Sequence, residues 1–245
     1  MIGRFILEPR WLWRLRNQNI ITVSESSRRS ILQYGAKKAT AVPKGYWPAM
    51  ATTTNKESIP TLVFLGRLGV YKRPIHAIKA FEIIRGHIPR AQLWIIGDGP
   101  LRKKLEAKAP HGVEFLGRLS ESEKVKRLAS ADLLIATSAR EIWGMVVYEA
   151  ARNGTPTIAY DVAGLVDSVL SHGGAVVRED PRALAFAVIR YFSGQLALAP
   201  IDGISLGKIL TWDAVALWIL RIVRSRTSGA YLFIFPIMTT PFSQD

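Results

Sequence analysis

Short apolar segments alternate with stretches of helical periodicity along most of the chain. Nearly continuous apolar strands, each followed by a helical pattern, are typical of a parallel sheet whose two faces are both covered by helices. We therefore predict a doubly wound α/β domain over residues 61–193, in which ligands bind at the carboxyl ends of the strands. The predicted strands are Thr61–Gly66, Gln92–Gly97, Val113–Gly117, Asp132–Thr137, Pro156–Tyr160 and Ala175–Val177.

Residues that favour helix starts stand after several of these strands. Pro74 and Pro100 fit the first turn of a helix, where a proline costs no hydrogen bond. Ser120 and Glu123 have the spacing of a capping box, in which each side chain accepts a hydrogen bond from the other residue's backbone N–H group. Further helices are predicted over residues 144–153, 164–171, 181–193 and 212–225.

The amino-terminal part of the chain predicts one smaller unit followed by a connection. Asn19–Val23 is a short apolar strand, and Ser24 is placed to cap a helix that runs to Gly35. The stretch from Thr40 to Pro60 is rich in proline, threonine and alanine, so we predict a linker there.

Composition narrows the classes of protein. Of the 245 residues, 49% are hydrophobic and 21% are charged, which excludes a disordered chain. The absence of cysteine excludes disulfides, thiolate zinc sites and cysteine nucleophiles. No apolar run reaches the ~18 residues that a membrane-spanning helix needs. The amino terminus also lacks the apolar core and the cleavage site of a signal peptide.

The chain is strongly basic, with 33 Lys and Arg against 19 Asp and Glu, and the excess lies in its first half. This charge indicates an anionic partner (nucleic acid, a membrane surface or a phosphorylated ligand) or a basic surface that is simply solvated. Aromatic residues do not interleave with the basic ones as in single-strand stacking platforms, which disfavours nucleic acid. The mixture of Phe5, Leu7, Trp11 and Trp13 with arginines suits an interfacial helix or a helix packed on a neighbouring domain.

Two cations follow the first strand of the predicted domain. Arg67 comes directly after Gly66, and Lys72 stands five positions later, before the helix that Pro74 opens. Cations on a loop at the carboxyl end of a strand face the place where an anion docks. A solvated basic loop is the alternative interpretation. Gly97 ends the second strand in a tight turn, and turn chemistry explains it without a ligand.

Two glutamates bracket a predicted helix start. Glu141 and Glu149 are eight positions apart, and Gly144 lies between them. A helix that starts at Gly144 offers unpaired N–H groups and the positive end of its dipole. Glu149 lies about a turn and a half into that helix, where its carboxylate can hold a diol by paired hydrogen bonds. The arrangement suits a ligand with phosphate between two sugars, and ordinary surface acids are the alternative.

Taken in order, these motifs resemble glycosyltransferase family 4. The resemblance covers about residues 19–225, and Trp212 fits a recurrent family position. It implies the two-domain GT-B fold with a Rossmann-like donor-binding half, and transfer with retention of anomeric configuration. The matching segments are Phe64–Arg67, Lys72–Pro74, Ile96–Pro100, Phe115–Gly117, Glu141–Gly144 and Glu149–Pro156.

The resemblance implies a role for each matching residue. Arg67 and Lys72 would neutralise the diphosphate of the donor, Glu141 would contact the transferred sugar, and Glu149 would hold the nucleotide ribose. No metal or other cofactor is implied, because the cations and a helix dipole neutralise the diphosphate. The other donor-binding positions, near the phosphates or the base, are Gly66, Gly97, Arg118, Leu119, Gly144, Met145 and Val146.

The chain also departs from the family. Family members place most of a first Rossmann-like domain before the position of Asn19, so the acceptor pocket and an amino-terminal glycine-rich loop are expected to be missing here. Lys44 replaces the usual asparagine before Gly45, and Trp143 replaces the commoner phenylalanine. The expected organisation is a remnant of the acceptor domain (1–45), a linker (46–60), the nucleotide-sugar-binding domain (61–200), a crossing helix (201–225) and an unassigned tail (226–245).

We therefore expect a glycosyl unit to pass from a nucleotide diphosphate sugar to the hydroxyl of a glycan or lipid acceptor, with no protein nucleophile. The alternatives are a nucleotide-sugar-binding module that needs a partner chain, a GT-B epimerase and a basic nucleic-acid-binding protein. The expected location is the cytoplasm or the inner face of an anionic membrane. The candidates for contact with a partner chain or a membrane surface are Phe5, Leu7, Trp11 and Trp13 together with Tyr231–Phe235. Four histidines, in no metal or triad spacing, are expected to be structural or exposed: His76, His87, His111 and His172.

Overall fold

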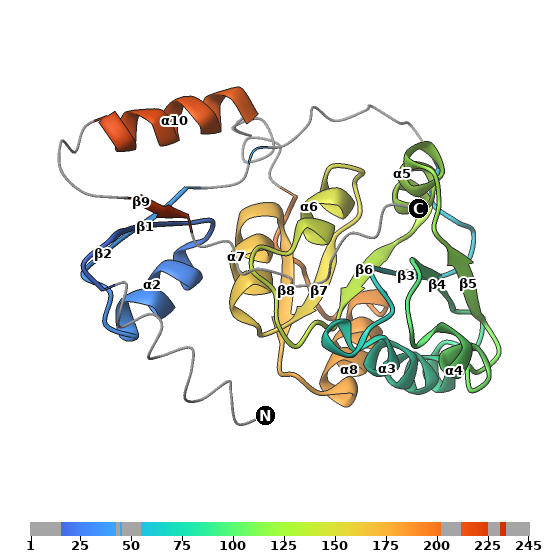
Figure 1. Cartoon of the computed structure of the whole chain (residues 1–245). Helices are drawn as coiled ribbons and strands as arrows, with labels where there is room; N and C mark the ends of the chain where they lie inside the picture. Colours follow the sequence, from blue (N-terminus) through green and yellow to red (C-terminus); the bar gives the residue numbers. More distant parts are fainter. Residues whose placement is uncertain (1–15, 43–44, 46–54, 202–211, 225–230, 234–245) are drawn as a thin grey trace. The chain divides into compact units, whose positions relative to one another are not determined.

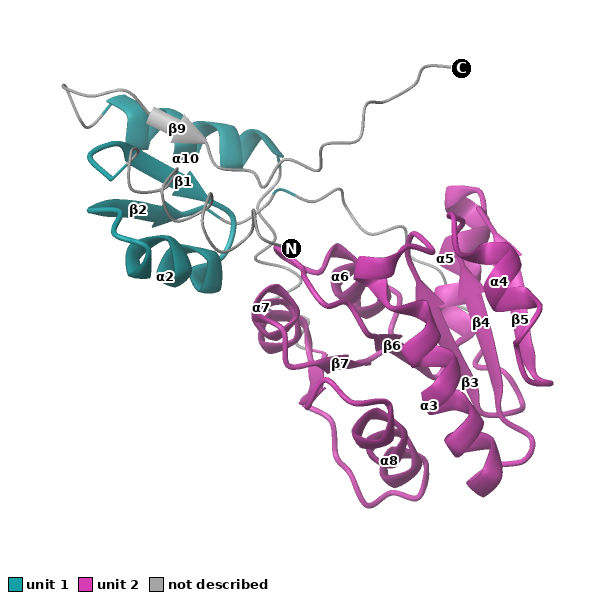
Figure 2. Ribbon diagram, turned by 60° about the horizontal axis from the view of Figure 1, so that its bottom comes forward, with its two compact units in different colours: residues 1–47, 209–245 teal, residues 48–208 magenta. Residues whose placement is uncertain are grey.

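The computed structural model describes residues 16–42, 45, 55–201, 212–224 and 231–233. The chain divides into two compact units, one made of residues 1–47 and 209–245 and the other of residues 48–208 (Figure 2). Each unit has its own parallel sheet. Within the described ranges, no helix is long and apolar enough to cross a membrane. The segment 5–13 and Lys44, both singled out from the sequence, lie outside the described residues.

The larger unit contains the predicted doubly wound sheet. Its strand order is β5-β4-β3-β6-β7-β8, and every neighbouring pair is parallel. The chain runs from β3 outward to β4 and β5, and then returns to place β6 on the other side of β3 (Figure 1). The sequence prediction of these strands is confirmed to within a residue or two. The strands are β3 (Thr61–Leu65), β4 (Gln92–Ile96), β5 (Val113–Gly117), β6 (Leu133–Ala136), β7 (Thr157–Tyr160) and β8 (Gly174–Val177).

Helices cover both faces of this sheet, which is why its strands are apolar at nearly every position. Leu62 and Phe64 pack in one cluster with residues of α3 and α8, whereas Val63 packs in another with Leu128 of α5 and Ala150 of α6. Figure 1 shows α3 and α8 on one face and α5 and α6 on the other. The helical elements are η1 (Val70–Lys72), α3 (Pro74–His87), α4 (Arg102–Glu106), α5 (Glu121–Ser130), α6 (Met145–Ala151), α7 (Ala163–His172) and α8 (Pro181–Phe192).

The predicted helix starts are largely as expected. Pro74 is the first residue of α3, and α4 begins two residues after Pro100. The capping box of α5 is present: the Ser120 N–H donates to the Glu123 carboxylate at 3.0 Å, and the Glu123 N–H donates to the Ser120 hydroxyl at 3.3 Å.

The smaller unit has a three-stranded parallel sheet in the order β2-β1-β9. Ile20 of β1 packs with Ile31 of α2 on one face, and Ile21 packs with Val215 of α10 on the other. The predicted linker from Thr40 is therefore wrong at its start, because residues 38–41 form strand β2. The elements are β1 (Asn19–Thr22), α2 (Glu25–Gln33), β2 (Lys38–Ala41), α10 (Trp212–Arg224) and β9 (Tyr231–Phe233).

Candidate functional site

The candidate site lies where the order of strands reverses. Strand β3 is flanked by β4, which follows it in sequence, and by β6, to which the chain returns after β5. At such a switch point the loops after the two strands diverge to opposite faces and leave space at the carboxyl ends. The loop after β3 carries Arg67 and Lys72, and the loop after β6 carries Glu141 and Gly144. The fold thus brings two distant sequence motifs to one edge of the sheet.

Glycines bring the ends of three neighbouring strands close together. The Gly66 N–H donates to the Ile96 carbonyl oxygen at 3.0 Å, and the Gly97 N–H donates to the Gly117 carbonyl oxygen at 2.7 Å. A Cβ atom on Gly97 would lie 2.1 Å from the Gly66 carbonyl oxygen, and Gly97 has φ +125°. The close approach of the two backbones therefore requires glycine at position 97, in agreement with the interpretation of Gly97 as a turn residue. This requirement holds whether or not Gly97 also contacts a ligand.

Lys72 and Glu141 form an ion pair across the switch point. The Lys72 ammonium contacts Glu141 Oε2, and the Ser138 hydroxyl donates to the same oxygen at 3.2 Å. The Lys72 and Glu141 side chains are only 22% and 14% exposed. Neither is an ordinary surface charge. Arg67, by contrast, is exposed and forms no ion pair within the described part of the chain.

Backbone contacts tie the two loops together around this pair. The buried Thr137 hydroxyl donates to the carbonyl oxygens of Lys72 and Arg73, both at 3.0 Å, and the Ala139 N–H donates to the Tyr71 carbonyl oxygen at 2.8 Å. Arg73 has the left-handed backbone conformation φ 48°, ψ 49°, which is unfavourable for a residue with a Cβ atom. The Thr137 hydrogen bond holds this conformation and so fixes where Lys72 leaves the backbone.

Gly144 forms the turn that starts helix α6. It has φ 71° and ψ 52°, and its carbonyl oxygen accepts a hydrogen bond from the buried Ser168 hydroxyl at 3.0 Å. A Cβ atom at this position would lie 3.1 Å from Leu165 Cδ2, so only glycine fits without displacement. Met145 and Val146 follow in the first turn, whose N–H groups have no partner within the helix.

Glu149 lies in α6 and pairs with a residue that the sequence interpretation missed. Its Oε2 atom lies 2.8 Å from Lys124 Nζ in α5, and Lys124 also lies 2.8 Å from Glu121 Oε2. Burial lowers the pKa of Lys124, but the hydrogen bonds and charges of the two carboxylates outweigh it, so the pKa is raised overall. Glu149 is 24% exposed and ion-paired, so the surface-acid alternative describes it poorly. The pairing of Lys124 depends on how α5 packs against α6, and no local motif signals it.

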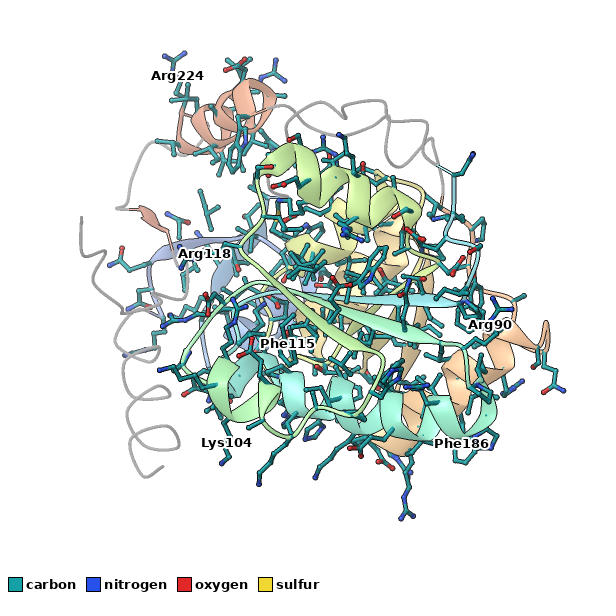
Figure 3. The ribbon with its side chains drawn as sticks, turned by 90° about the vertical axis from the view of Figure 1, so that its right-hand side faces the viewer. Arg90, Lys104, Phe115, Arg118, Phe186 and Arg224 are labelled. Atoms are coloured by element: carbon teal, nitrogen blue, oxygen red, sulfur yellow. The ribbon has the colours of Figure 1, made fainter. Side chains whose placement is uncertain are left out.

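Arg118 and Leu119 follow strand β5, the edge strand that lies next to β4. Arg118 is exposed, and Figure 3 shows it at the opposite end of the larger unit's sheet from Arg90. Leu119 is half-buried and packs against the cluster around Trp94, so its side chain has a structural role. The assignment of both residues to the nucleotide base stays a prediction.

The histidines have the expected structural or exposed positions. His87 and His111 are exposed, and His76 Nδ1 is hydrogen-bonded to the Tyr160 hydroxyl at 3.1 Å. His172 is buried, and its Nδ1 donates to the Ser168 carbonyl oxygen at 2.8 Å. Burial lowers the pKa of His172, which therefore favours the neutral ring. Among the residues that the structure describes, no three His, Asp or Glu side chains gather closely enough to hold a metal ion.

Known proteins share the fold of this chain. The structure of Anabaena Alr3699/HepE in complex with UDP and glucose matches with a TM-score of 0.67 and 18% identity, over 90% of this chain and 67% of that one. A GDP-mannose-dependent alpha-(1-6)-phosphatidylinositol dimannoside mannosyltransferase of Mycobacterium tuberculosis is 35% identical over 129 residues, 52% of this chain and 34% of its own. A glycogen synthase of the same organism is 31% identical over 193 residues, 73% of this chain and 46% of its own.

The chain thus spans between a third and a half of the length of these curated relatives. The solved neighbours are GT-B transferases, which confirms the predicted Rossmann-like half of that fold. The family model described as glycosyl transferases group 1 matches residues 48–199, a range that contains every candidate site residue named above. The chain belongs to the group 1 glycosyl transferases.

Proposed function

We propose that the chain binds a nucleotide diphosphate sugar at the carboxyl ends of β3 and β6, as the donor-binding part of a retaining glycosyltransferase. The observation that carries this proposal is the meeting of Lys72 and Glu141 at the point where the strand order reverses. A cation for phosphate and a carboxylate for sugar hydroxyls lie there side by side, beside the start of α6. This pairing of groups suits a ligand in which phosphate is joined directly to a sugar.

Each group has a chemical task in this proposal. Arg67, Lys72 and the N–H groups of residues 144–146 face the diphosphate, Glu141 accepts hydrogen bonds from the transferred sugar, and Glu149 accepts them from the ribose. During transfer the bond between the anomeric carbon and the phosphate oxygen breaks, and the oxygen of the acceptor hydroxyl takes its place on the same face of the sugar while its proton passes to the leaving phosphate. The cations stabilise the charge that develops on the leaving phosphate. They supply the positive charge that a divalent ion supplies in other transferases.

The relatives support a nucleotide-sugar donor but differ in the nucleotide. One solved neighbour holds UDP and glucose, and the mannosyltransferase is named for its dependence on GDP-mannose. The base-binding positions proposed here are Arg118 and Leu119, and only the first has an exposed polar side chain. Both uridine and guanosine nucleotides therefore belong in the binding test.

A second candidate function is donor binding without transfer. In this proposal the described sheet supplies the donor side, because the match covers only 34% and 46% of the relatives' own length. Efficient transfer needs donor and acceptor held in one geometry, which can lower a barrier by ~7–11 kcal/mol. We propose that the chain by itself shows at most slow donor hydrolysis, and that the acceptor, a glycan or a lipid at the inner face of a membrane, is held by a further domain or partner chain. Transfer by the purified chain at ~1 per second or faster would exclude this second candidate.

Titration calorimetry tests the binding site directly. UDP, GDP, UDP-glucose, GDP-mannose and inorganic pyrophosphate are titrated into the purified chain. A charge-assisted hydrogen bond is worth ~1.5–3 kcal/mol, so Arg67→Ala should weaken every diphosphate ligand about tenfold. Arg90→Ala is the matched control, because Arg90 is equally exposed but lies at the other end of the sheet (Figure 3). Glu149→Ala should weaken the nucleotides and leave pyrophosphate unchanged. Absence of heat with every ligand at millimolar concentration would refute the proposed site.

A further inference from the structure

The ion pair between Lys72 and Glu141 has a consequence for which ligand the site prefers. Without a ligand, the Lys72 ammonium is already neutralised by the Glu141 carboxylate. The Ser138 hydroxyl donates to the same carboxylate oxygen at 3.2 Å, so the oxygen that faces Lys72 has a second hydrogen-bond donor. Both side chains are mostly buried, and water screens their attraction less than it would at the surface. The pair is part of the resting site.

A bare diphosphate meets an unfavourable site in this state. To bind Lys72, its oxygens must share the ammonium with Glu141, and the carboxylate repels the approaching negative charges. No other carboxylate forms an ion pair with Lys72 among the described residues, so Glu141 is the group with which the diphosphate competes. The repulsion acts on pyrophosphate and on a nucleoside diphosphate alike.

An intact nucleotide sugar meets a different site. Its sugar carries neutral hydroxyl groups, which donate hydrogen bonds to a carboxylate and compensate its charge in place of the ammonium. When the sugar occupies Glu141, Lys72 is free to turn its full charge to the diphosphate. Once the sugar has been transferred, Glu141 loses these hydrogen-bond donors and forms its ion pair with Lys72 again.

We propose that Glu141 competes with the donor's diphosphate for Lys72, so that the site binds an intact nucleotide sugar in preference to the nucleoside diphosphate that remains after transfer. Glu141 is then a specificity-determining residue that also promotes product release. The inference rests on the proposed function, because it requires that the loop after β3 binds a diphosphate.

The test compares the wild-type chain with Glu141→Gln in calorimetric titrations with pyrophosphate, UDP, GDP, UDP-glucose and GDP-mannose. Glutamine keeps the shape of the side chain and still accepts the Ser138 hydrogen bond, but it removes the charge. We expect pyrophosphate and both nucleoside diphosphates to bind about tenfold more tightly, as for the loss of one like charge nearby. The nucleotide sugars should gain less or lose affinity, so the preference for the intact donor collapses. Glu141→Ala, which also removes the charge, serves if the first variant does not fold.

Two further variants separate the outcomes. Glu179→Gln is the matched control: it removes a carboxylate paired with Arg73, the neighbour of Lys72, and should change pyrophosphate binding by less than about threefold. In a Lys72→Met background, Glu141→Gln should no longer give the same gain, because the competition acts through Lys72. If Lys72→Met weakens pyrophosphate binding while Glu141→Gln leaves it unchanged or weaker, the proposed function stands and this inference is wrong. If neither the wild-type chain nor the variant binds any of the ligands, both are wrong.

Discussion

Two buried threonines of the neighbouring parallel strands β6 and β7, at opposite edges of the sheet, offer a test of what holds the site's loops. Thr137 follows β6 and is 1% exposed, and Thr157 begins β7 and is 0% exposed. The Thr137 hydroxyl donates to the carbonyl oxygens of Lys72 and Arg73, both at 3.0 Å. Within the described residues, the buried Thr157 hydroxyl has no hydrogen-bond partner. Replacing each by valine makes the same change of shape, but only Thr137→Val removes hydrogen bonds.

Of the two substitutions, only Thr137→Val should lower the free energy of unfolding. Thr137→Val removes the hydrogen bond and leaves the Lys72 carbonyl oxygen without its donor, whereas the Arg73 carbonyl keeps the His76 N–H at 2.9 Å. A net hydrogen bond contributes ~0.5–1.5 kcal/mol and an unsatisfied buried group costs ~1–3 kcal/mol, so we expect a loss of ~1.5–3 kcal/mol. Thr157→Val removes a hydroxyl that is buried without a partner, so it should be neutral or stabilise by up to ~1 kcal/mol.

The measurement must report on the larger unit alone, since a chain of two units need not unfold in one step. Hydrogen exchange of peptides from β3 and β4, followed across a urea titration, gives the free energy of unfolding of the unit that holds the site. Thr137→Ser, which keeps the hydroxyl, should recover most of the lost stability. If Thr157→Val costs as much as Thr137→Val, the loss comes from a general intolerance of buried threonine positions, and the role given to the Thr137 hydrogen bonds is wrong.

Two further predictions concern the sheet edge and the buried histidine. Gly97→Ala should destabilise the larger unit by more than about 3 kcal/mol in the same titration, because its Cβ atom would lie 2.1 Å from the Gly66 carbonyl oxygen. Gly154→Ala is the control: Gly154 has φ +75° but open space around it, so this substitution should cost only about 1–2 kcal/mol. Equal costs would contradict the close-approach argument. Burial lowers the pKa of His172 below the value of about 6.5 that it has in the unfolded chain. Between these two values the unfolded chain binds a proton that the folded chain does not. The contribution of His172 to stability therefore falls as the pH drops below about 6.5. His172→Gln should flatten this slope in melting temperatures measured from pH 7 to pH 5, and an unchanged slope would exclude His172 as its source.

The sheet of the larger unit was predictable because its strands have only one way to be buried. A run such as Thr61–Leu65 is apolar on both faces, and only helices on both sides of a sheet can cover it. Strand β2 was missed for the opposite reason. Residues 38–41 lie at the edge of the small sheet and are exposed or half-buried, so polar side chains are tolerated and the sequence resembles a linker. Its neighbour β1 also pairs with β9, at the other end of the chain, and no local signal reports such a distant partner.

The positions of the candidate site residues were predictable, but their partners were not. Motif and strand order place Lys72 and Glu141 at one edge of the sheet, because parallel strands present their carboxyl ends together. That these two residues neutralise each other follows from side-chain geometry across 69 positions of sequence. Lys124 was overlooked for the same reason: its contact with Glu149 exists only once α5 and α6 have packed.

These ion pairs change what can be inferred about the site from the net positive charge of the chain. The net charge of +14 suggested a strongly positive surface for an anion. Yet Lys72 is neutralised by Glu141, and Lys124 faces two carboxylates, so neither lysine offers an uncompensated charge to an arriving diphosphate. Long-range attraction at this edge must come from exposed cations without a described ion pair, of which Arg67 is one. The paired lysines can contribute only when the ligand itself displaces their carboxylates. Under the proposed competition, a sugar that carries hydroxyl groups displaces Lys72 from Glu141, whereas a bare diphosphate does not.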